Sequence, residues 1–457
     1  MEPSVMDMSE KDNILKFTVS NINMSMANAI RRVILADIPT VVFRTAPYAK
    51  NKATFEFNTS RLNNEILKQR LSCIPIHLKP LDSLIKDYIM ELDIKNDTDS
   101  LIYVTSADFK VKSVTTGKYL RDTTLQSIFP PDPISQQYID LCRLRPKLSD
   151  NLIGEHLKLT CEFSIGTAGE NGAFNVASTC SYASTPDPYK ISQVKEEKLA
   201  ELRAKYEDEE AVKYHLTDWA NLAAKRITIP DSFDFKIESV GVFQNTEIVL
   251  SAINIIISRL GKVIEIYSKP NTLIIDSDAT IINSFDITLE GEDYTIGKIL
   301  EYILYETYYK GKKTLTFCGF RKPHPHIDIS IIRLGFSAAV DKNIAAEYII
   351  ESAGLAIKYF EKLLPHFGQI HPDELVAVQT SIPQTITVKS QNTKKTEPQP
   401  EPAAPPSEPP SEPPSEPPSE PPSEPQSDTE DITASVSQVP MAIPGTAEEI
   451  EVEKTIG

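Results

Sequence analysis

The chain has 457 residues, enough for two or three domains with a sizeable core. Its formal charge of −17 gives no indication of a basic surface for binding DNA or anionic membranes. Residues 390–457 hold 14 acidic and three basic residues, a net charge of −11, which leaves −6 for the first 389 residues. The first residues lack the apolar run of a signal peptide, and no apolar stretch is long enough to span a membrane. We therefore expect a soluble, intracellular protein.

The cysteines are dispersed, without the paired spacing of a zinc ribbon or a disulfide framework. They are Cys73, Cys142, Cys161, Cys180 and Cys318. Reduced and mostly buried thiols are the simplest interpretation. His324 and His326 could ligate a metal in principle, but in a Pro-His-Pro turn a structural role is favoured. We expect no metal and no other cofactor.

The stretch 21–43 predicts a strand-helix-strand unit with 14–20 before it. Its apolar residues recur at three- and four-residue steps and share one helix face: Met26, Ile30, Val33 and Ile34. Pro39 ends this helix, and 40–43 reads as a strand. Arg31 and Arg32 are adjacent, so at most one of them can lie against the apolar face. The helix therefore needs a partner on each side.

A second helix is predicted within 59–78, with Leu62, Ile66 and Leu71 on one face. Glu65 and Arg70 project from it, and taken singly each reads as a solvated surface charge. Short strands and turns follow up to residue 185, which indicates a β-rich domain inserted into the first unit. Residues 193–226 predict a highly charged surface helix.

Residues 233–263 predict a strand followed by a long helix. The apolar face of this helix is too broad for a surface helix. Its members include Val249, Ile253, Ile256 and Leu260.

After a break at 269–271 the pattern is strands (273–275, 284–289), a helix (293–307), strands (314–317, 327–334) and a long helix (341–364). Its apolar faces include Ile296, Leu300, Ile344, Tyr348 and Phe360. Because the first unit has nearly the same order once its insert is removed, we expect an α+β fold in which each half buries its helices against the other. Whether the halves pair within one chain or between chains stays open.

The predicted domain division follows from these patterns. Residues 1–45 with 230–268 form a first dimerisation module, 46–229 the insert, 272–366 a second module, and 390–457 a disordered, acidic tail. Sixteen of the 34 prolines lie in that tail, and such a composition cannot bury enough apolar surface to fold. Its PxxP spacing also suits an SH3-like domain, but we favour a passive spacer.

Two motifs resemble a known family. NAIRRVILADIPTVVF, followed by LNNEILKQRLSCIPI, is similar to the alpha-like subunit of multisubunit DNA-directed RNA polymerases, the family of the archaeal D-type subunit and the third-largest subunit of RNA polymerase II. GENGAFNVASTCSY and DSFDFKIESVGVFQNTEIVLSAINII are similar to its insert and long dimerisation helix. The resemblance covers about 14–263.

The second half resembles the smaller partner, the archaeal L-type subunit or the eleventh subunit of RNA polymerase II. EGEDYTIGKILEYIL and FCGFRKPHPHIDISIIRL carry this resemblance, through Asp293, Thr295, Gly297, Gly319, Pro323, His324 and Pro325. Tyr294 departs from the histidine usual there. The whole chain thus resembles a fusion of the two subunits, an arrangement known in large cytoplasmic DNA viruses, which implies a viral source.

The resemblance implies a non-catalytic scaffold on which the two largest polymerase subunits and small assembly subunits gather, with DNA reached only through the complex. The residues that it places against the large subunits are Asn28, Arg31, Arg32, Glu65 and Arg70. A viral source implies host cytoplasm and virion, with the nucleus as the alternative.

Two other classes of function compete with this one. An independent enzyme is disfavoured because the sequence has no GxSxG, P-loop, HExxH or magnesium-binding aspartate triplet. A free-standing adaptor that acts through the proline-rich tail is the second alternative.

Overall fold

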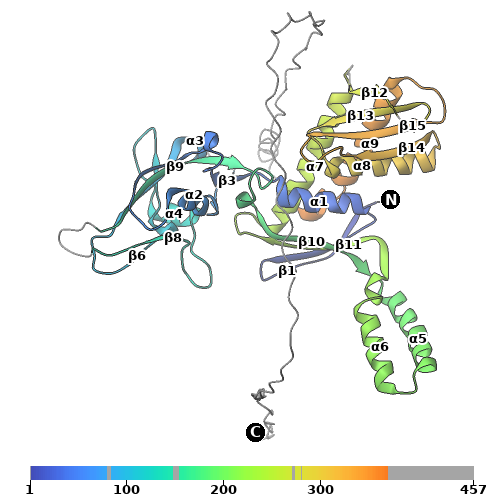
Figure 1. The fold of residues 1–457 in the computed structure, drawn as a ribbon, viewed down its shortest axis with the longest axis horizontal. Coiled ribbons are helices and arrows are strands. Elements are labelled where there is room, and N and C mark those ends of the chain that lie inside the picture. Colours follow the sequence, from blue (N-terminus) through green and yellow to red (C-terminus); the bar gives the residue numbers. More distant parts are fainter. Residues whose placement is uncertain (1, 80–83, 148–153, 270–272, 279, 369–457) are drawn as a thin grey trace, which may run out of the picture. The chain divides into compact units, whose positions relative to one another are not determined.

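The computed structural model describes residues 2–79, 84–147, 154–269, 273–278 and 280–368. Helices and antiparallel sheets alternate along this part of the chain (Figure 1), which confirms the expected α+β class. The predicted tail, 390–457, and the break at residues 270–271 lie outside the described residues.

The first sheet has the strand order β1-β2-β11-β10. Its strands are β1 (Ser4–Lys11), β2 (Ile14–Ser20), β11 (Thr228–Ser239) and β10 (Ala177–Pro186). Leu15, Phe17 and Val19 are buried at every second position, as a strand with one face on a core requires. Because β10 pairs with β11 along most of its length, part of the range predicted as an insert, 46–229, belongs to this sheet.

Two helices cover this sheet. Helix α1 (Met24–Ala36) begins at Asn23, whose side chain accepts a hydrogen bond from the Ser25 N–H. Helix α7 (Asn245–Tyr267) follows β11 directly and buries 11 of its side chains, which accounts for its broad apolar face.

The second sheet has the order β12-β13-β15-β14. Its strands are β12 (Ile274–Asp276), β13 (Ser284–Glu290), β15 (Ile329–Phe336) and β14 (Leu315–Arg321). Its helices are α8 (Tyr294–Leu304), which continues as a π-helical turn (Tyr305–Gly311), α9 (Lys342–Glu361) and α10 (Leu364–Phe367).

The four long helices of these two sheets share one hydrophobic core. Helix α1 packs against α7 and α8, and α7 packs against α9. Of the apolar residues predicted to face a partner, Ile344 and Tyr348 are partly buried against this core. The others are buried within it: Met26, Ile30, Val33, Ile34, Val249, Ile253, Ile256, Leu260, Ile296, Leu300 and Phe360. Burying such a side chain fully contributes about 1.5–3 kcal/mol.

A separate core lies within the stretch between β3 and β9. Its main sheet has the order β3-β9-β5-β7, with β4 also paired to β9, and β6 and β8 form a small second sheet. The strands are β3 (Thr40–Phe43), β4 (Ala53–Asn58), β5 (Tyr88–Lys95), β6 (Ile102–Thr105), β7 (Lys110–Ser113), β8 (Asp140–Leu144) and β9 (His156–Gly166), and the helices are α2 (Asn64–Ser72), α3 (Leu84–Asp87) and α4 (Asp122–Ile128). On α2, Leu67 and Leu71 are buried while Ile66 is 43% exposed. Of the predicted face, Leu71 therefore lies in the core and Leu62 is partly buried against it, whereas the prediction for Ile66 was wrong.

Between β10 and β11 the chain forms a helical hairpin, α5 (Pro188–Lys205) and α6 (Glu209–Asn221), drawn in green in Figure 1. The single charged helix predicted over 193–226 is thus two helices. The break falls where Asp208 accepts a hydrogen bond from the Glu210 N–H and starts α6.

Candidate functional site

The adjacent arginines of α1 have different partners. Arg31 donates through its guanidinium to Asn28 Oδ1, at 2.9 and 3.2 Å. Arg32 donates from Nε to Thr295 Oγ1 at 2.8 Å and pairs with Asp293. Consecutive helix residues lie about 100° apart, so two neighbouring arginines point to different surroundings. Arg32 therefore links α1 to the start of α8.

Asp293 holds the N-terminus of α8. Its Oδ1 accepts a hydrogen bond from the Thr295 N–H at 2.9 Å. Burial raises the pKa of Asp293, but the hydrogen bonds from Thr295 and the charge of Arg32 outweigh burial and hold the pKa below its usual value. The carboxylate is therefore charged at neutral pH.

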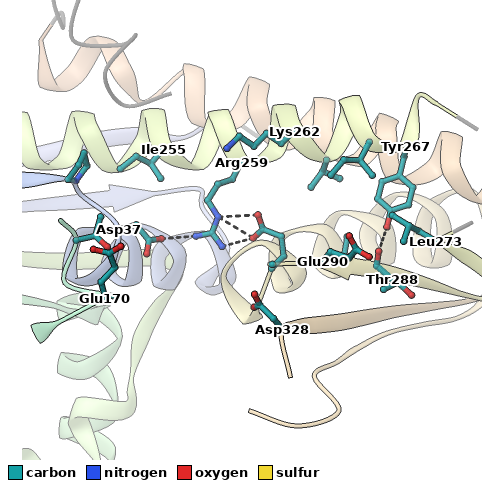
Figure 2. A pocket seen from close by; sticks show the side chains of 18 residues that line it. Asp37, Glu170, Ile255, Arg259, Lys262, Tyr267, Leu273, Thr288, Glu290 and Asp328 are labelled. Carbon is teal, nitrogen blue, oxygen red and sulfur yellow. Dashed lines mark hydrogen bonds and ion pairs between the residues drawn. The ribbon is translucent and has the colours of Figure 1, made fainter. Parts of the chain in front are cut away.

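A partly buried arginine of α7 completes an ion cluster with two more carboxylates. Arg259 Nη1 lies 2.7 Å from Asp37 Oδ2, and its Nη2 lies 2.5 Å from Glu292 Oε2. Figure 2 shows the Arg259 guanidinium directed toward Asp37. Burial raises the pKa of Asp37 and of Glu292, and Arg259 opposes that rise without cancelling it. One guanidinium thus compensates two partly buried carboxylates.

A cavity of about 410 Å³ lies beside this cluster (Figure 2). It is bounded by α7, by the segment between α1 and β3, by the loop after β9, and by the segment that leads from β13 into α8, with Leu273 and Asp328 also in its lining. Val263 and Leu289 are among its buried lining residues, and Ile266 is 42% exposed.

The predicted interface residues of α2, Glu65 and Arg70, do not share a core with those of α1, because the buried side chains of α2 belong to the separate core between β3 and β9. The Glu65 side chain is 79% exposed and pairs with Lys68 at 2.9 Å. Arg70 donates from Nη1 to the Leu141 carbonyl oxygen at 2.8 Å. The structure thus connects Arg32, but neither Glu65 nor Arg70, to the second sheet's helices.

The second motif divides into packing residues and an exposed turn. A Cβ at Gly297 would lie 2.0 Å from the Phe320 ring, so only glycine lets α8 approach β14 this closely. A Cβ at Gly319 would lie 2.9 Å from the Phe317 ring. Pro323, His324 and Pro325 are exposed in the turn between β14 and β15.

Sequence reasoning missed Asp37, Arg259 and Glu292 as a unit. The available signal was the single arginine within the apolar run INIIISRLGKV, since a charge there has to be paired. Its partners were not predictable, because they come from two distant segments of the chain.

Four of the five cysteine thiols are buried or partly buried. Cys142, Cys161 and Cys180 are buried, Cys318 is partly buried, and Cys73 is exposed. Burial raises the pKa of Cys142 to about 11 and that of Cys180 and Cys318 to about 12. Within the described residues, no three His, Cys, Asp or Glu side chains gather as they would around a metal ion.

Among the described helices, none has the length and apolarity to cross a bilayer.

Comparison with known proteins places the chain in a family. Residues 16–260, more than half of the chain, match the RNA polymerase Rpb3/Rpb11 dimerisation domain. The rpac1 subunit of RNA polymerases I and III from Dictyostelium discoideum is 26% identical over 303 residues, covering 57% of this chain and 81% of the relative. The third subunit of RNA polymerases II, IV and V from Arabidopsis thaliana is 24% identical, covering 55% and 88%.

An archaeal relative, the Rpo3 subunit of the RNA polymerase of Pyrococcus furiosus, is 32% identical over 108 residues, covering 22% of this chain and 38% of the relative. Members of this family are assembly subunits rather than catalytic subunits, and other polymerase subunits are their partners. The chain belongs to the Rpb3/Rpb11 dimerisation family and is a non-catalytic, alpha-like assembly subunit of a multisubunit DNA-directed RNA polymerase.

Proposed function

We propose that this chain fuses the two alpha-like subunits of an RNA polymerase into one platform. The first module would comprise 1–45 and 230–268, with β10 added to it, the insert most of 46–229, and the second module 272–366. The observation that carries the proposal is the single core to which the helices of both sheets contribute, with α1 against α8 and α7 against α9.

The fusion would make association of the halves intramolecular. With separate subunits the two halves must first meet, whereas a short linker supplies an effective concentration on the order of millimolar. The apolar faces of α7 and α9 would otherwise be exposed to water in the unpaired halves, at risk of aggregation.

The platform would recruit the two largest polymerase subunits and small assembly subunits. The residues proposed to face them are Asn28, Arg31, Arg32, Glu65 and Arg70, since an arginine fork suits paired contact with carboxylates and carbonyls. DNA would be reached only through the complex. The fused order also supports a source among large DNA viruses, with assembly in host cytoplasm and virion rather than nucleus.

The pairing is tested by inserting a protease site between residues 270 and 272 of the full chain. After cleavage, the two halves should co-elute in size-exclusion chromatography at the mass of one chain. Separate elution would refute pairing, and a mass of two chains would show pairing between copies. Affinity purification of the tagged chain should then bring down the two largest polymerase subunits.

The adaptor function remains a second candidate, supported only by the PxxP spacing of residues 390–457. Deleting these residues separates the two functions, because an adaptor would lose its partners and a polymerase scaffold would keep them.

A further inference from the structure

The walls of the cavity of about 410 Å³ beside Arg259 come from several separate segments of the described chain: α7, the segment between α1 and β3, the loop after β9, and the segment from β13 into α8, together with Leu273 and Asp328. Its volume falls within the range of about 300–1,000 Å³ typical of ligand pockets. Figure 2 shows Ile255, Arg259, Lys262 and Tyr267 along α7, with Thr288, Glu290 and Asp328 on the opposite side. We call this recess the α7 groove.

The loop wall of the α7 groove is held in place by contacts within the chain. The Gly169 N–H donates to the Ala36 carbonyl oxygen at 2.7 Å. Arg44 Nη2 lies 2.7 Å from Glu170 Oε2 and donates to the Ile165 carbonyl oxygen at 2.7 Å. Its guanidinium also lies over the Phe174 ring, 5.6 Å from the centroid.

The wall formed by the segment from β13 into α8 and by Asp328 is also held in place by hydrogen bonds within the chain. The Gly291 N–H donates to the Asp328 carbonyl oxygen at 2.9 Å. Ser330 Oγ donates to the Glu292 carbonyl oxygen at 2.6 Å. Both walls are therefore formed before any partner arrives, which lowers the entropy cost of binding.

The α7 groove is acidic. Its lining holds five carboxylates against two cationic side chains, a net charge of −3: Asp37, Glu170, Glu290, Glu292 and Asp328 against Arg259 and Lys262. Glu170 is paired with Arg44, while Asp37 and Glu292 share Arg259. Glu290 and Asp328 are exposed, and neither carboxylate has a cationic partner among the described residues. They lie at neighbouring strand ends, since Glu290 is paired in register with Ile329.

We propose that the α7 groove docks an extended segment of another polymerase subunit that places a lysine or arginine against Glu290 and Asp328 and apolar side chains against Val263 and Ile266. The inference rests on the proposed scaffold function and names the chemistry of one partner. Charge decides against the chain's own residues 390–457 as the occupant, because their net charge of −11 opposes the negative lining.

The first test reverses the unpaired charges in the full chain. Binding of the purified chain to the remaining reconstituted polymerase subunits is titrated at about 0.05 M and about 0.5 M salt. The double variant Glu290→Lys, Asp328→Lys should weaken binding by about tenfold at low salt and by much less at high salt, since the contact is electrostatic.

Two matched variants give the sign of the effect. Lys262→Ala removes the cation that opposes an incoming lysine or arginine, so it should strengthen binding by about twofold at low salt. Glu196→Lys with Glu197→Lys makes the same charge reversal on exposed positions of α5 and should leave binding unchanged. The inference is overturned if the α5 double variant loses as much binding as the groove double variant, or if Glu290→Lys with Asp328→Lys loses no binding.

The second test identifies the occupant. A photo-crosslinking p-benzoylphenylalanine replaces Ile266 in the full chain, and the reconstituted polymerase is irradiated and analysed by mass spectrometry. The same replacement at Tyr189, which is 74% exposed on α5, is the control. A crosslink from position 266 alone to a segment of another subunit that contains lysine or arginine supports the inference.

A crosslink to residues 369–457 of the same chain, to a segment without a basic residue, or to nothing overturns it. The two levels are distinguishable. A chain that fails to enter the polymerase refutes the scaffold function itself, whereas a chain that assembles normally in every variant refutes only the α7 groove as a docking site.

Discussion

Replacing Arg259 by methionine tests the ion cluster between α1, α7 and the second sheet. The side chain is 13% exposed, and its loss leaves Asp37 and Glu292, 32% and 14% exposed, without their main cation. Removing one partner from a buried ion pair costs about 3–5 kcal/mol. We expect about 3 kcal/mol here, because Asp37 keeps some solvent contact.

The free energy of unfolding is measured by urea denaturation of the full chain at pH 7, followed by circular dichroism. The control is Lys262→Met, on the same helix, which has no carboxylate partner among the described residues and should cost at most about 0.5 kcal/mol. The triple variant Arg259→Met, Asp37→Leu, Glu292→Met should recover most of the loss, because an apolar replacement leaves no charge buried and unpaired.

The loss should depend on pH with a defined sign. Burial already raises the pKa of Glu292 and of Asp37, and removing Arg259 raises both further. The pKa of Glu in the unfolded chain is about 4.3. When the folded-state pKa lies above it, the protonated carboxyl stabilises the fold below the unfolded pKa, and this stability is lost as pH rises through the folded pKa. The Arg259→Met deficit should therefore shrink between pH 7 and pH 4.5. A deficit under about 1 kcal/mol at pH 7, or one that grows on acidification, would refute the reasoning.

Three further outcomes are expected. Gly297→Ala should cost at least about 1–3 kcal/mol of unfolding free energy, because the new Cβ meets the Phe320 ring; the added substitution Phe320→Leu should restore part of it in the same urea titration. Arg32→Ala should leave the circular dichroism spectrum unchanged but reduce co-purification with the second-largest polymerase subunit. Asp293→Asn is the matched control. Equal loss of co-purification in both variants would mean that Arg32 acts only within the chain. Deleting residues 390–457 should leave the co-purifying polymerase subunits unchanged, and their loss would favour the adaptor function.

The helices of the shared core were predictable because their apolar residues keep one period over many turns. Met26, Ile30 and Val33 specify a face without any knowledge of the partner. The same holds for β3, where Pro39 ends the helix and all four following residues are buried.

Shorter elements with mixed sequences were not predictable in the same way. Strand β1 is an edge strand with Met6 and Met8 both exposed, so it lacks the apolar alternation that marks a strand. Helix α2 starts at Asn64, after the Asn63 cap. Leu62 therefore lies outside the helix, and the buried pair is Leu67 and Leu71, four residues apart.

Membership of a sheet was the least predictable feature. Strand β10 follows the insert in sequence, yet pairs with β11 across the α5–α6 hairpin. Strand pairing over such a distance depends on the whole fold and leaves no local signal.

The ion cluster has a physical role that apolar packing cannot supply. Apolar contact is non-directional, so the broad faces of α7 and α9 would tolerate small shifts in register. Arg259 allows few such shifts, because its fork must meet Asp37 after α1 and Glu292 before α8 at once. Since a buried ion pair adds little net stability over apolar residues of the same size, we infer that the cluster mainly fixes how α1 and α7 meet the second sheet. The triple apolar variant separates these contributions, because it should keep the unfolding free energy while broadening the distribution of structures.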